Sequence, residues 1–562
     1  MAFKIIETLV PAPVAKGATE EMVLMRDGIA LATDIYLPEG ATKHSAILVR
    51  TPYDKSSRYT ALKYEADYYC ARGYAVVAQD VRGKFRSEGQ TVPYAFDVAD
   101  GYDTVEWIAQ QPWSNGNVGV TGGSYYGFTA WAAVASGHPA IKAAVPQVTG
   151  IEMGDGHIGG RWHLDVPSLI SLNDLLQIWT DNKGYLAEID WSAGIEKVFE
   201  AARDAVGECV SADEKSQRAA AEDWYNPYGA RHPYHTTQIP ILHWQNWYDP
   251  GLAPSGMKDW RYFRSLAGHR NLHYLHVGSA DHAGFKLENV GKGDEFNPYI
   301  DERALAEKIE AECGEVADFF DEHLNGVVPC KPRPRARWHA GNVGWQTSEE
   351  YPPPSTPVTF YLAHTDEQIG ALSRVAPTTS ARATWKHDPD HPVPSTTEIE
   401  EVWYLLAAYP DEREIAERRD VLTFRSEPLA EPVDFAGRPV LTVSVEFSSP
   451  STHLFAKLQD VHPDGTTRPI SWGRVVLTKA IGGTVRLALD DNAYRLAEGH
   501  SLQLQIQSSD FPYYAVHPGT DECPWFATRR VISEHSIAIG GIAGAHLELP
   551  TVSFSNAAGL FR

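Results

Sequence analysis

The stretch that most constrains the fold runs from Val118 to Gly127, where a β-rich run enters a Gly-Gly-Ser turn and leaves it as a helix. Strand, sharp turn with a central serine, and helix is the context of a nucleophile elbow, which lifts the Ser124 hydroxyl above the end of a sheet. The N-terminus of the helix then points at developing negative charge. The motif here is G-x-S-x-x-G, in which the second glycine comes one position later than in the usual G-x-S-x-G. An ordinary glycine-rich turn is therefore the alternative interpretation.

Strand and helix patterns alternate on both sides of this turn. Apolar runs typical of buried parallel strands lie at residues 46–50, 74–79, 141–146, 239–245 and 272–277. Helical patterns lie at residues 60–72, 96–110 and 302–324. This alternation predicts a mostly parallel sheet that is covered by helices on both faces.

Two stretches depart from this alternation of strands and helices. Residues 151–235 contain helical patterns with glycine-rich and aromatic connectors and no strand run, which indicates a helical insertion of the kind that often covers a site. Beyond Pro329 several prolines mark a linker or an edge crossing, and short strand patterns separated by turn residues then continue to the end. That second pattern predicts a β-sandwich of jelly-roll type.

Charge and cysteine content exclude several classes of protein. A net charge of −24 leaves no basic stripe for phosphates, so we expect no nucleic-acid partner. Five scattered cysteines without a C-x-x-C pair indicate neither a disulfide framework nor a zinc site, and are typical of reduced thiols. Because no signal-peptide pattern and no apolar run of about 18 residues is visible, we expect a cytoplasmic protein without membrane contact.

A serine hydroxyl is a poor nucleophile at neutral pH unless a histidine takes its proton and a carboxylate orients that histidine. In hydrolases with a nucleophile elbow the acid and then the histidine follow the serine along the chain, each after a strand. Asp249 follows the run at 239–245 and His282 follows the run at 272–277. The order therefore predicts a triad of Ser124, Asp249 and His282.

The chain contains other candidates for the base and the acid. Because it has 22 histidines, the presence of any one of them is weak evidence for a catalytic base. His243, His273 and His276 lie within apparent strands, where a packing role is expected. Asp281 adjoins His282, but side chains of adjacent residues point in different directions, so Asp281 is interpreted as a loop residue.

An oxyanion hole would complete the site. The backbone N–H of Tyr125, the residue after the nucleophile, is one expected donor. The loop at residues 51–55 follows an earlier strand and has no Gly-Gly tract, but the phenolic O–H of Tyr53 is an adequate second donor. The alternative for Tyr53 is a packing aromatic.

Several short motifs together resemble those of one known family. They are Thr-Pro-Tyr-Asp-Lys (51–55), Asp-Val-Arg-Gly (80–83), Ser-Glu-Gly (87–89), Gly-Gly-Ser-Tyr-Tyr-Gly (122–127) and the Gly-x-x-x-His loop (278–282). The chain resembles the cocaine esterase / X-prolyl dipeptidyl-peptidase (S15) family of serine hydrolases along nearly its whole length. The loop before His282 departs from the family, since it reads Gly-Ser-Ala-Asp where Gly-Pro-Trp-x is frequent.

The resemblance implies an α/β fold made of an α/β-hydrolase domain with an inserted helical cap and a C-terminal jelly-roll β-sandwich. The expected domains are residues 1–150 with 236–330, the cap at 151–235, and the sandwich at 331–562. It also implies Ser124 as nucleophile, His282 as base, Asp249 as orienting acid, and Tyr125 N–H with Tyr53 O–H as oxyanion donors. The family pattern G-x-S-Y-x-G accounts for the late glycine. Neither a metal nor another cofactor is implied.

The expected activity is hydrolysis of a small-molecule carboxylic ester, with amides as further substrates, through an acyl-enzyme on Ser124. Trp162, Trp247 and the Tyr125 side chain are candidate pocket walls, with packing as the alternative. An X-prolyl dipeptidyl-peptidase or α-amino acid ester hydrolase is the first alternative, and acids of the cap could then bind the substrate amine: Asp155, Asp165 and Asp174. A carbohydrate-binding protein on an inactive hydrolase scaffold is the second. Assembly into a homo-oligomer stays open.

Overall fold

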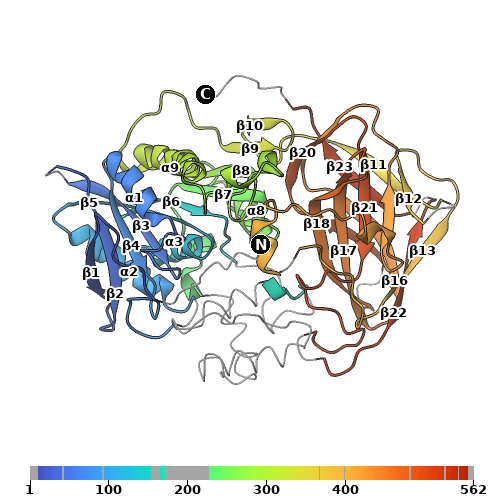
Figure 1. The fold of residues 1–562 in the computed structure, drawn as a ribbon, viewed down its shortest axis with the longest axis horizontal. Coiled ribbons are helices and arrows are strands. Elements are labelled where there is room, and N and C mark those ends of the chain that lie inside the picture. Colours follow the sequence, from blue (N-terminus) through green and yellow to red (C-terminus); the bar gives the residue numbers. More distant parts are fainter. Residues whose placement is uncertain are drawn as a thin grey trace.

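The structure is a computed structural model that describes residues 10–40, 43–91, 94–152, 165–170, 227–365, 368–397, 399–479, 483–524, 527–541 and 544–554. Most of the expected cap, including Trp162, lies outside these residues. The described chain forms two bodies side by side, an α/β domain and a domain made almost wholly of strands (Figure 1).

The first body is built on a ten-stranded sheet in the order β1-β2-β4-β3-β5-β6-β7-β8-β9-β10. Its strands are β1 (Thr19–Leu24), β2 (Ala30–Tyr36), β3 (His44–Thr51), β4 (Ala75–Asp80), β5 (Ser114–Gly123), β6 (Ile141–Gln147), β7 (Ile241–Tyr248), β8 (His273–Asp281), β9 (Ala336–Ala340) and β10 (Gly344–Ser348). Neighbours from β4 through β9 run parallel, and the outer pairs are antiparallel. The carboxyl ends of the central strands therefore meet at one edge of the sheet.

Helices cover both faces of this sheet, as the alternation predicted. They are α1 (Leu62–Ala71), α2 (Asp97–Gln110), α3 (Ser124–Ser136), α7 (Pro233–Thr236), α8 (Ala253–Ser265) and α9 (Glu302–Leu324), with 3-10 turns η3 (Gly229–Arg231), η4 (Leu287–Asn289) and η5 (Asp294–Phe296). Apolar residues of α2, α3 and α8 share one core cluster, and those of α1 and α9 share another. The contact between α9 and the sheet is close, because a Cβ on Gly119 of β5 would lie 2.8 Å from the Phe320 ring.

The second body is a β-sandwich around one apolar core (Figure 1). Its strands are β11 (Thr356–Ala363), β12 (Gly370–Ser373), β13 (Ala381–His387), β14 (Leu422–Arg425), β15 (Val433–Gly437), β16 (Val440–Phe447), β17 (Ser451–Val461), β18 (Thr467–Thr478), β19 (Thr484–Ala488), β20 (Asn492–Leu496), β21 (Ser501–Gln507), β22 (Ser533–Ile539) and β23 (His546–Thr551), with turns η6 (Ile399–Tyr404) and η7 (Ile415–Glu417). Buried leucines such as Leu441, Leu458 and Leu504 fill the space between its layers. The predicted fold class, an α/β-hydrolase domain followed by a β-sandwich, is confirmed.

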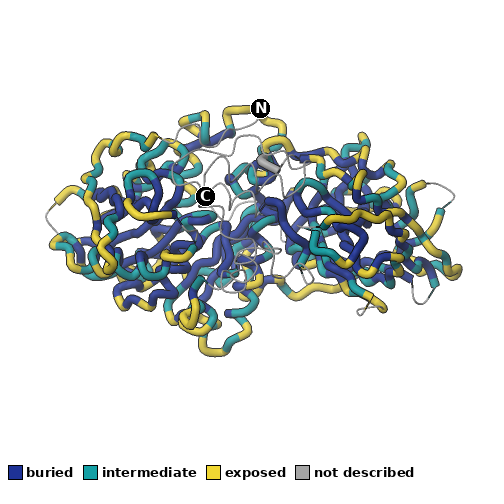
Figure 2. The backbone as a smooth tube through the Cα atoms, turned by 90° about the horizontal axis from the view of Figure 1, so that it is seen from below, coloured by how far each residue is buried: buried dark blue, intermediate teal, exposed yellow. Residues whose placement is uncertain are grey.

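The first sheet continues past residue 330, where the sequence placed the start of the sandwich domain. Strand β9 pairs in parallel with β8 through Val277 and Trp338, and β10 completes the sheet edge. The prolines in this stretch predict a linker or an edge crossing, but β9 after them alternates buried and half-buried side chains, as a strand with one face in the core does. Trp338 and Tyr351 then pack with residues of both bodies in a shared core, and Figure 2 shows buried chain in both halves and at their junction.

Candidate active site

Ser124 is the first residue of α3 and directly follows β5. Its φ is 57°, in the left-handed region that non-glycine residues seldom occupy, while the preceding Gly123 is extended. Such strain costs about 1–3 kcal/mol and persists only where the surrounding structure imposes it. The serine therefore stands on the sharp strand-to-helix turn that a nucleophile elbow requires.

The unusual spacing of the motif follows from backbone contacts of α3. A Cβ on Gly127 would lie 2.8 Å from the carbonyl oxygens of both Gly122 and Gln147, so the first turn of the helix touches β5 and β6. A Cβ on Gly122, whose φ is 150°, would lie 2.6 Å from the Tyr126 ring. Glycine is required at these two positions, and the serine lies between them.

Asp249 and His282 leave the same edge of the sheet as Ser124. They follow β7 and β8, whose last residues Tyr248 and Asp281 are paired neighbours. His282 Nδ1 lies 2.7 Å from Asp249 Oδ2, and the other carboxylate oxygen accepts the N–H of Leu252 at 3.2 Å. Asp249 is fully buried and His282 is half-buried. With Nδ1 held by the carboxylate, Nε2 is the ring nitrogen suited to act as a base.

Asp281, predicted to be a loop residue, instead ends β8 and holds the histidine loop in place. Its two carboxylate oxygens accept the N–H groups of Phe285 and Leu406, each at 2.9 Å. Burial is the main cause that raises the pKa of Asp281 to about 8. Because Leu406 follows η6 of the second body, this carboxyl group joins the histidine loop to the chain of the sandwich domain.

Trp403 of the same segment is a site residue that the sequence analysis missed. Its ring centroid lies 4.4 Å from that of His282, and its carbonyl accepts the N–H of Ala283 at 3.0 Å. A Cβ on Gly251, two residues after Asp249, would lie 3.0 Å from the indole. No local pattern marks Trp403, since it comes from a short turn about 120 residues beyond His282 in a different domain.

Tyr53 lies close to the first turn of α3. Its half-buried ring makes edge contacts with Tyr126, at 6.1 Å between centroids, and with Tyr59, at 6.0 Å. Tyr59 in turn stacks on Tyr299, which contacts Tyr404 at 5.8 Å. A continuous set of aromatic rings therefore connects Tyr53 with the segment that carries Trp403.

The loop that carries Tyr53 is fixed by a buried lysine. The Lys55 ammonium is fully buried and pairs with Asp34 at 3.1 Å, Asp80 at 3.5 Å and Glu20 at 2.8 Å. The Lys55 N–H also donates to Asp80 Oδ1 at 2.8 Å. These contacts explain the Thr-Pro-Tyr-Asp-Lys and Asp-Val-Arg-Gly motifs as a support for the loop, in which Asp80 is structural.

The Tyr125 side chain points into the core. Its O–H donates to Asp97 Oδ2 at 3.0 Å and accepts the N–H of Tyr94 at 2.8 Å, and its ring stacks on Tyr94 with centroids 4.8 Å apart. The backbone of Tyr125 directly follows Ser124 in the first turn of α3. The side chain anchors the elbow and does not serve as a pocket wall.

Trp247 corrects another expectation. It is 2% exposed, its indole N–H donates to the His339 carbonyl at 2.8 Å, and its ring packs on Tyr351. It is a core residue at the junction of the two bodies, because its side chain points toward β9 and the sandwich. Three of the other proposed substrate contacts lie outside the described residues, namely Asp155, Trp162 and Asp174. Asp165 is described and is half-buried.

The strand histidines are packing residues, as expected. His243 and His273 are buried and contact each other, Nε2 to Nδ1, at 2.8 Å. Burial lowers the pKa of His243 to about 3. His276 is buried against the Trp244 ring, with centroids 3.8 Å apart. Among the described residues, none of these three histidines forms a hydrogen bond or an ion pair with Asp249.

The sheet, the serine turn and the added sandwich define an α/β-hydrolase of the two-domain type. Residues 27–284 match the family model of X-Pro dipeptidyl-peptidase (S15 family), and residues 325–536 match that of the X-Pro dipeptidyl-peptidase C-terminal non-catalytic domain. The chain belongs to the S15 family and is a serine hydrolase.

Individual relatives agree with this assignment. Cocaine esterase of Rhodococcus sp. (strain MB1 Bresler) is 29% identical over 543 residues, which cover 88% of this chain and 91% of that protein. An α-amino acid ester hydrolase has a TM-score of 0.78 at 24% identity, covering 98% of this chain and 100% of its own. An aminopeptidase from a marine sediment archaeon (Thaumarchaeota archaeon) has a TM-score of 0.77 at 23% identity, covering 98% and 99%. The two structures share the fold along the whole chain.

Proposed function

We propose that this serine hydrolase cleaves carboxylic esters through an acyl-enzyme on Ser124, with His282 as base and Asp249 as orienting acid. The observation that carries the proposal is a shared sheet edge. Ser124, at a φ of 57°, starts a helix at the edge where His282 Nδ1 and Asp249 Oδ2 lie 2.7 Å apart. A strained serine and a buried histidine–carboxylate pair are the parts that acyl transfer needs.

In the proposed reaction, Ser124 Oγ attacks the ester carbonyl carbon while its proton passes to His282 Nε2. The carbonyl oxygen becomes an oxyanion that accepts hydrogen bonds from the Tyr125 N–H and the Tyr53 O–H. The C–O bond to the alcohol breaks as His282 returns the proton to the leaving oxygen. Water then attacks the acyl-enzyme by the same route, giving the free acid and regenerating Ser124. No step uses a metal or cofactor.

Substrate preference is argued from Trp403. Its half-buried ring has its centroid 4.4 Å from that of the His282 ring. We therefore expect the indole to lie beside the reacting carbonyl. An indole face in this position favours a compact apolar or aromatic group in the substrate. The name of the related cocaine esterase supports ester hydrolysis.

Hydrolysis of X-prolyl peptides or α-amino acid esters is the alternative, favoured by the names of the family model and of a structural relative. Such substrates carry a free amine, which requires a carboxylate near the acyl site.

The deciding experiment compares p-nitrophenyl butyrate and benzoate with phenylglycine methyl ester and Gly-Pro-p-nitroanilide, using the native chain and S124A. We expect high kcat/KM on the p-nitrophenyl esters, lost in S124A. Strong anilide turnover without ester turnover would replace the proposal by the peptidase alternative. A fluorophosphonate should label the native chain and not S124A, and absence of labelling in both would favour a carbohydrate-binding role.

We also propose the cytoplasm as the compartment. Among the cysteines that the structure describes, Cys70, Cys313 and Cys330 are free thiols, as expected in a reducing environment. Among the described residues, no helix combines the length and the apolar character needed to cross a bilayer. Fractionation of the source cells would test the proposal, and recovery in the medium would contradict it.

A further inference from the structure

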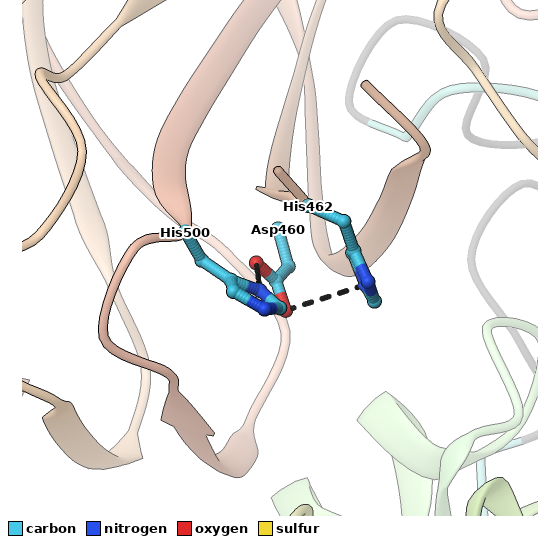
Figure 3. Close-up of side chains that lie close together, drawn as sticks. All are labelled: Asp460, His462 and His500. Carbon is cyan, nitrogen blue, oxygen red and sulfur yellow. Dashed lines mark hydrogen bonds and ion pairs between the residues drawn. The ribbon is translucent and has the colours of Figure 1, made fainter. Parts of the chain in front are cut away.

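We propose that Asp460, His462 and His500 of the β-sandwich form a binding site for a divalent transition-metal ion of the zinc class. Figure 3 shows the carboxylate of Asp460 lying between the two imidazoles. The sequence indicated no metal site because it contains no cysteine pair, and this cluster uses no cysteine.

Strand pairing places the three side chains together. Asp460 is near the end of β17, and His462 begins the hairpin that leads to β18. His500 immediately precedes β21, and Val461 of β17 pairs with Ser501 of β21. The hairpin is closed by the His462 N–H, which donates to the Thr466 carbonyl at 2.8 Å. The backbone around the candidate ligands is therefore fixed by the sheet.

The distances suit a metal ion after small rotations of the rings. His500 Nδ1 lies 2.8 Å from Asp460 Oδ1, and His462 Nε2 lies 3.7 Å from Asp460 Oδ2. One ligand atom from each residue lies within 4.8 Å of the other two. Two ligands of a tetrahedral zinc ion are about 3.3 Å apart, a value between the two observed distances. The imidazoles are 17% and 38% exposed for His500 and His462, so they are accessible to an ion and have room to turn.

Charge supports a cation at this place. The Asp460 side chain is completely buried, and among the residues that the structure describes no lysine or arginine forms an ion pair with it. The O–H of Tyr494 donates to Asp460 Oδ2 at 2.9 Å and brings no charge. A buried carboxylate needs a compensating charge. The two imidazole centroids are 4.5 Å apart, so two imidazolium ions would repel each other. One divalent ion bound by two neutral imidazoles provides the charge without that repulsion.

The ligand chemistry selects the kind of metal. Two imidazoles with one carboxylate suit zinc, nickel, cobalt or copper, whereas magnesium and calcium prefer oxygen ligands alone. Three protein ligands leave a further position for water.

The place of the cluster indicates a structural role. Tyr494, which hydrogen-bonds Asp460, also packs on Gly341, where a Cβ would lie 2.6 Å from the tyrosine ring. Gly341 connects β9 and β10 of the first sheet. An ion at Asp460 would thus hold the Tyr494 side chain in place and stabilise the packing of the sandwich against the edge of the hydrolase sheet.

The test is zinc binding by the full-length chain after removal of metals with EDTA. Calorimetric titration with ZnCl2 is compared for the native protein, H462A, H500A and the control H391A. His391 also contacts an aspartate, with Nδ1 3.1 Å from Asp388 Oδ2, but it is 83% exposed and belongs to no three-ligand cluster among the described residues. The native protein and H391A should bind one more equivalent of zinc than H462A and H500A, and zinc should raise their Tm. Cobalt should give the visible absorption of a nitrogen- and oxygen-bound ion in the same two proteins.

Two further measurements keep the result interpretable. Circular dichroism and ester hydrolysis show whether H462A and H500A are folded. Among the described residues, His462 and His500 contact Asp460 and each other and do not contact Ser124, Asp249 or His282, so their loss should leave turnover unchanged. H282A shows whether zinc binds the catalytic histidine, and it should keep the additional equivalent. Equal zinc uptake by the native protein, H462A and H500A, or no saturable uptake by the native protein, would overturn the proposal.

Discussion

His282 Nδ1 lies 2.7 Å from Asp249 Oδ2, and Asp249 is 0% exposed. A carboxylate in this position holds one tautomer of the imidazole and stabilises the imidazolium that forms when the serine is deprotonated. The Leu252 N–H on the second oxygen fixes the direction of the carboxylate.

The first prediction concerns Asp249→Asn. The amide keeps the shape but can donate to Nδ1, which favours the wrong tautomer of His282. We expect kcat on p-nitrophenyl butyrate to fall about 10³- to 10⁴-fold. Steady-state kinetics measure the effect, and the Tm of the variant serves as the control for folding. A loss below ten-fold would contradict the role of Asp249.

The second prediction concerns backbone strain at Ser124, whose φ is 57°. Both S124A and S124G should be inactive, since neither carries a nucleophile. S124G should nevertheless be the more stable by about 1 kcal/mol, because glycine adopts a positive φ without steric cost. Urea denaturation of the two variants measures the difference. Equal stability would show that the turn stores no strain.

The third prediction concerns Tyr53→Phe. The ring keeps its contacts with Tyr59 and Tyr126, so the Tm should change little. Loss of one oxyanion donor should lower kcat about 10²- to 10³-fold, with KM little affected. Unchanged kcat with a lowered Tm would instead assign Tyr53 to packing alone.

The fourth prediction concerns Trp403→Leu. The leucine keeps an apolar surface but removes the aromatic face beside His282. KM for p-nitrophenyl benzoate should rise about three- to ten-fold, while KM for the acetate ester changes less. Trp345→Leu, a half-buried tryptophan on β10, is the matched control and should leave both values unchanged. Equal effects on the two esters would argue against an aromatic contact.

The fifth prediction concerns Asp281 and pH. Burial raises the pKa of this carboxyl from 3.8 to about 8, so between these values the folded state holds a proton that the unfolded state has lost. Asp281 therefore contributes a stability that is fully present below pH 4 and is lost as the pH rises toward 8. In Asp281→Asn the decline of the free energy of unfolding from pH 5 to pH 8 should be smaller. Denaturation at both pH values measures it, with the exposed Glu39→Gln as control, and an unchanged decline would contradict the assignment.

The sequence predicted much of the first body because its signals are local. The period of apolar residues marks parallel strands and covering helices, and the Gly-Gly-Ser turn requires a strand before it and a helix after it. Since parallel strands end at one edge, the positions of Asp249 and His282 after β7 and β8 already implied that they lie near each other. The short strands at the sheet edge, β9 and β10, have a weak local pattern, and the prolines on either side of them predict a linker or an edge crossing instead of strands.

What the sequence determined by itself was the order of elements, the serine turn and the edge of the sheet at which Ser124, Asp249 and His282 lie. Only the tertiary structure decided that Trp403 reaches His282 from the sandwich domain, that Asp281 joins the two bodies, and that Trp247 is buried. The physical reason is that a strand or a turn depends on neighbours a few residues away. The surroundings of a side chain depend on which distant segments pack against it, and that choice is made by the whole core at once.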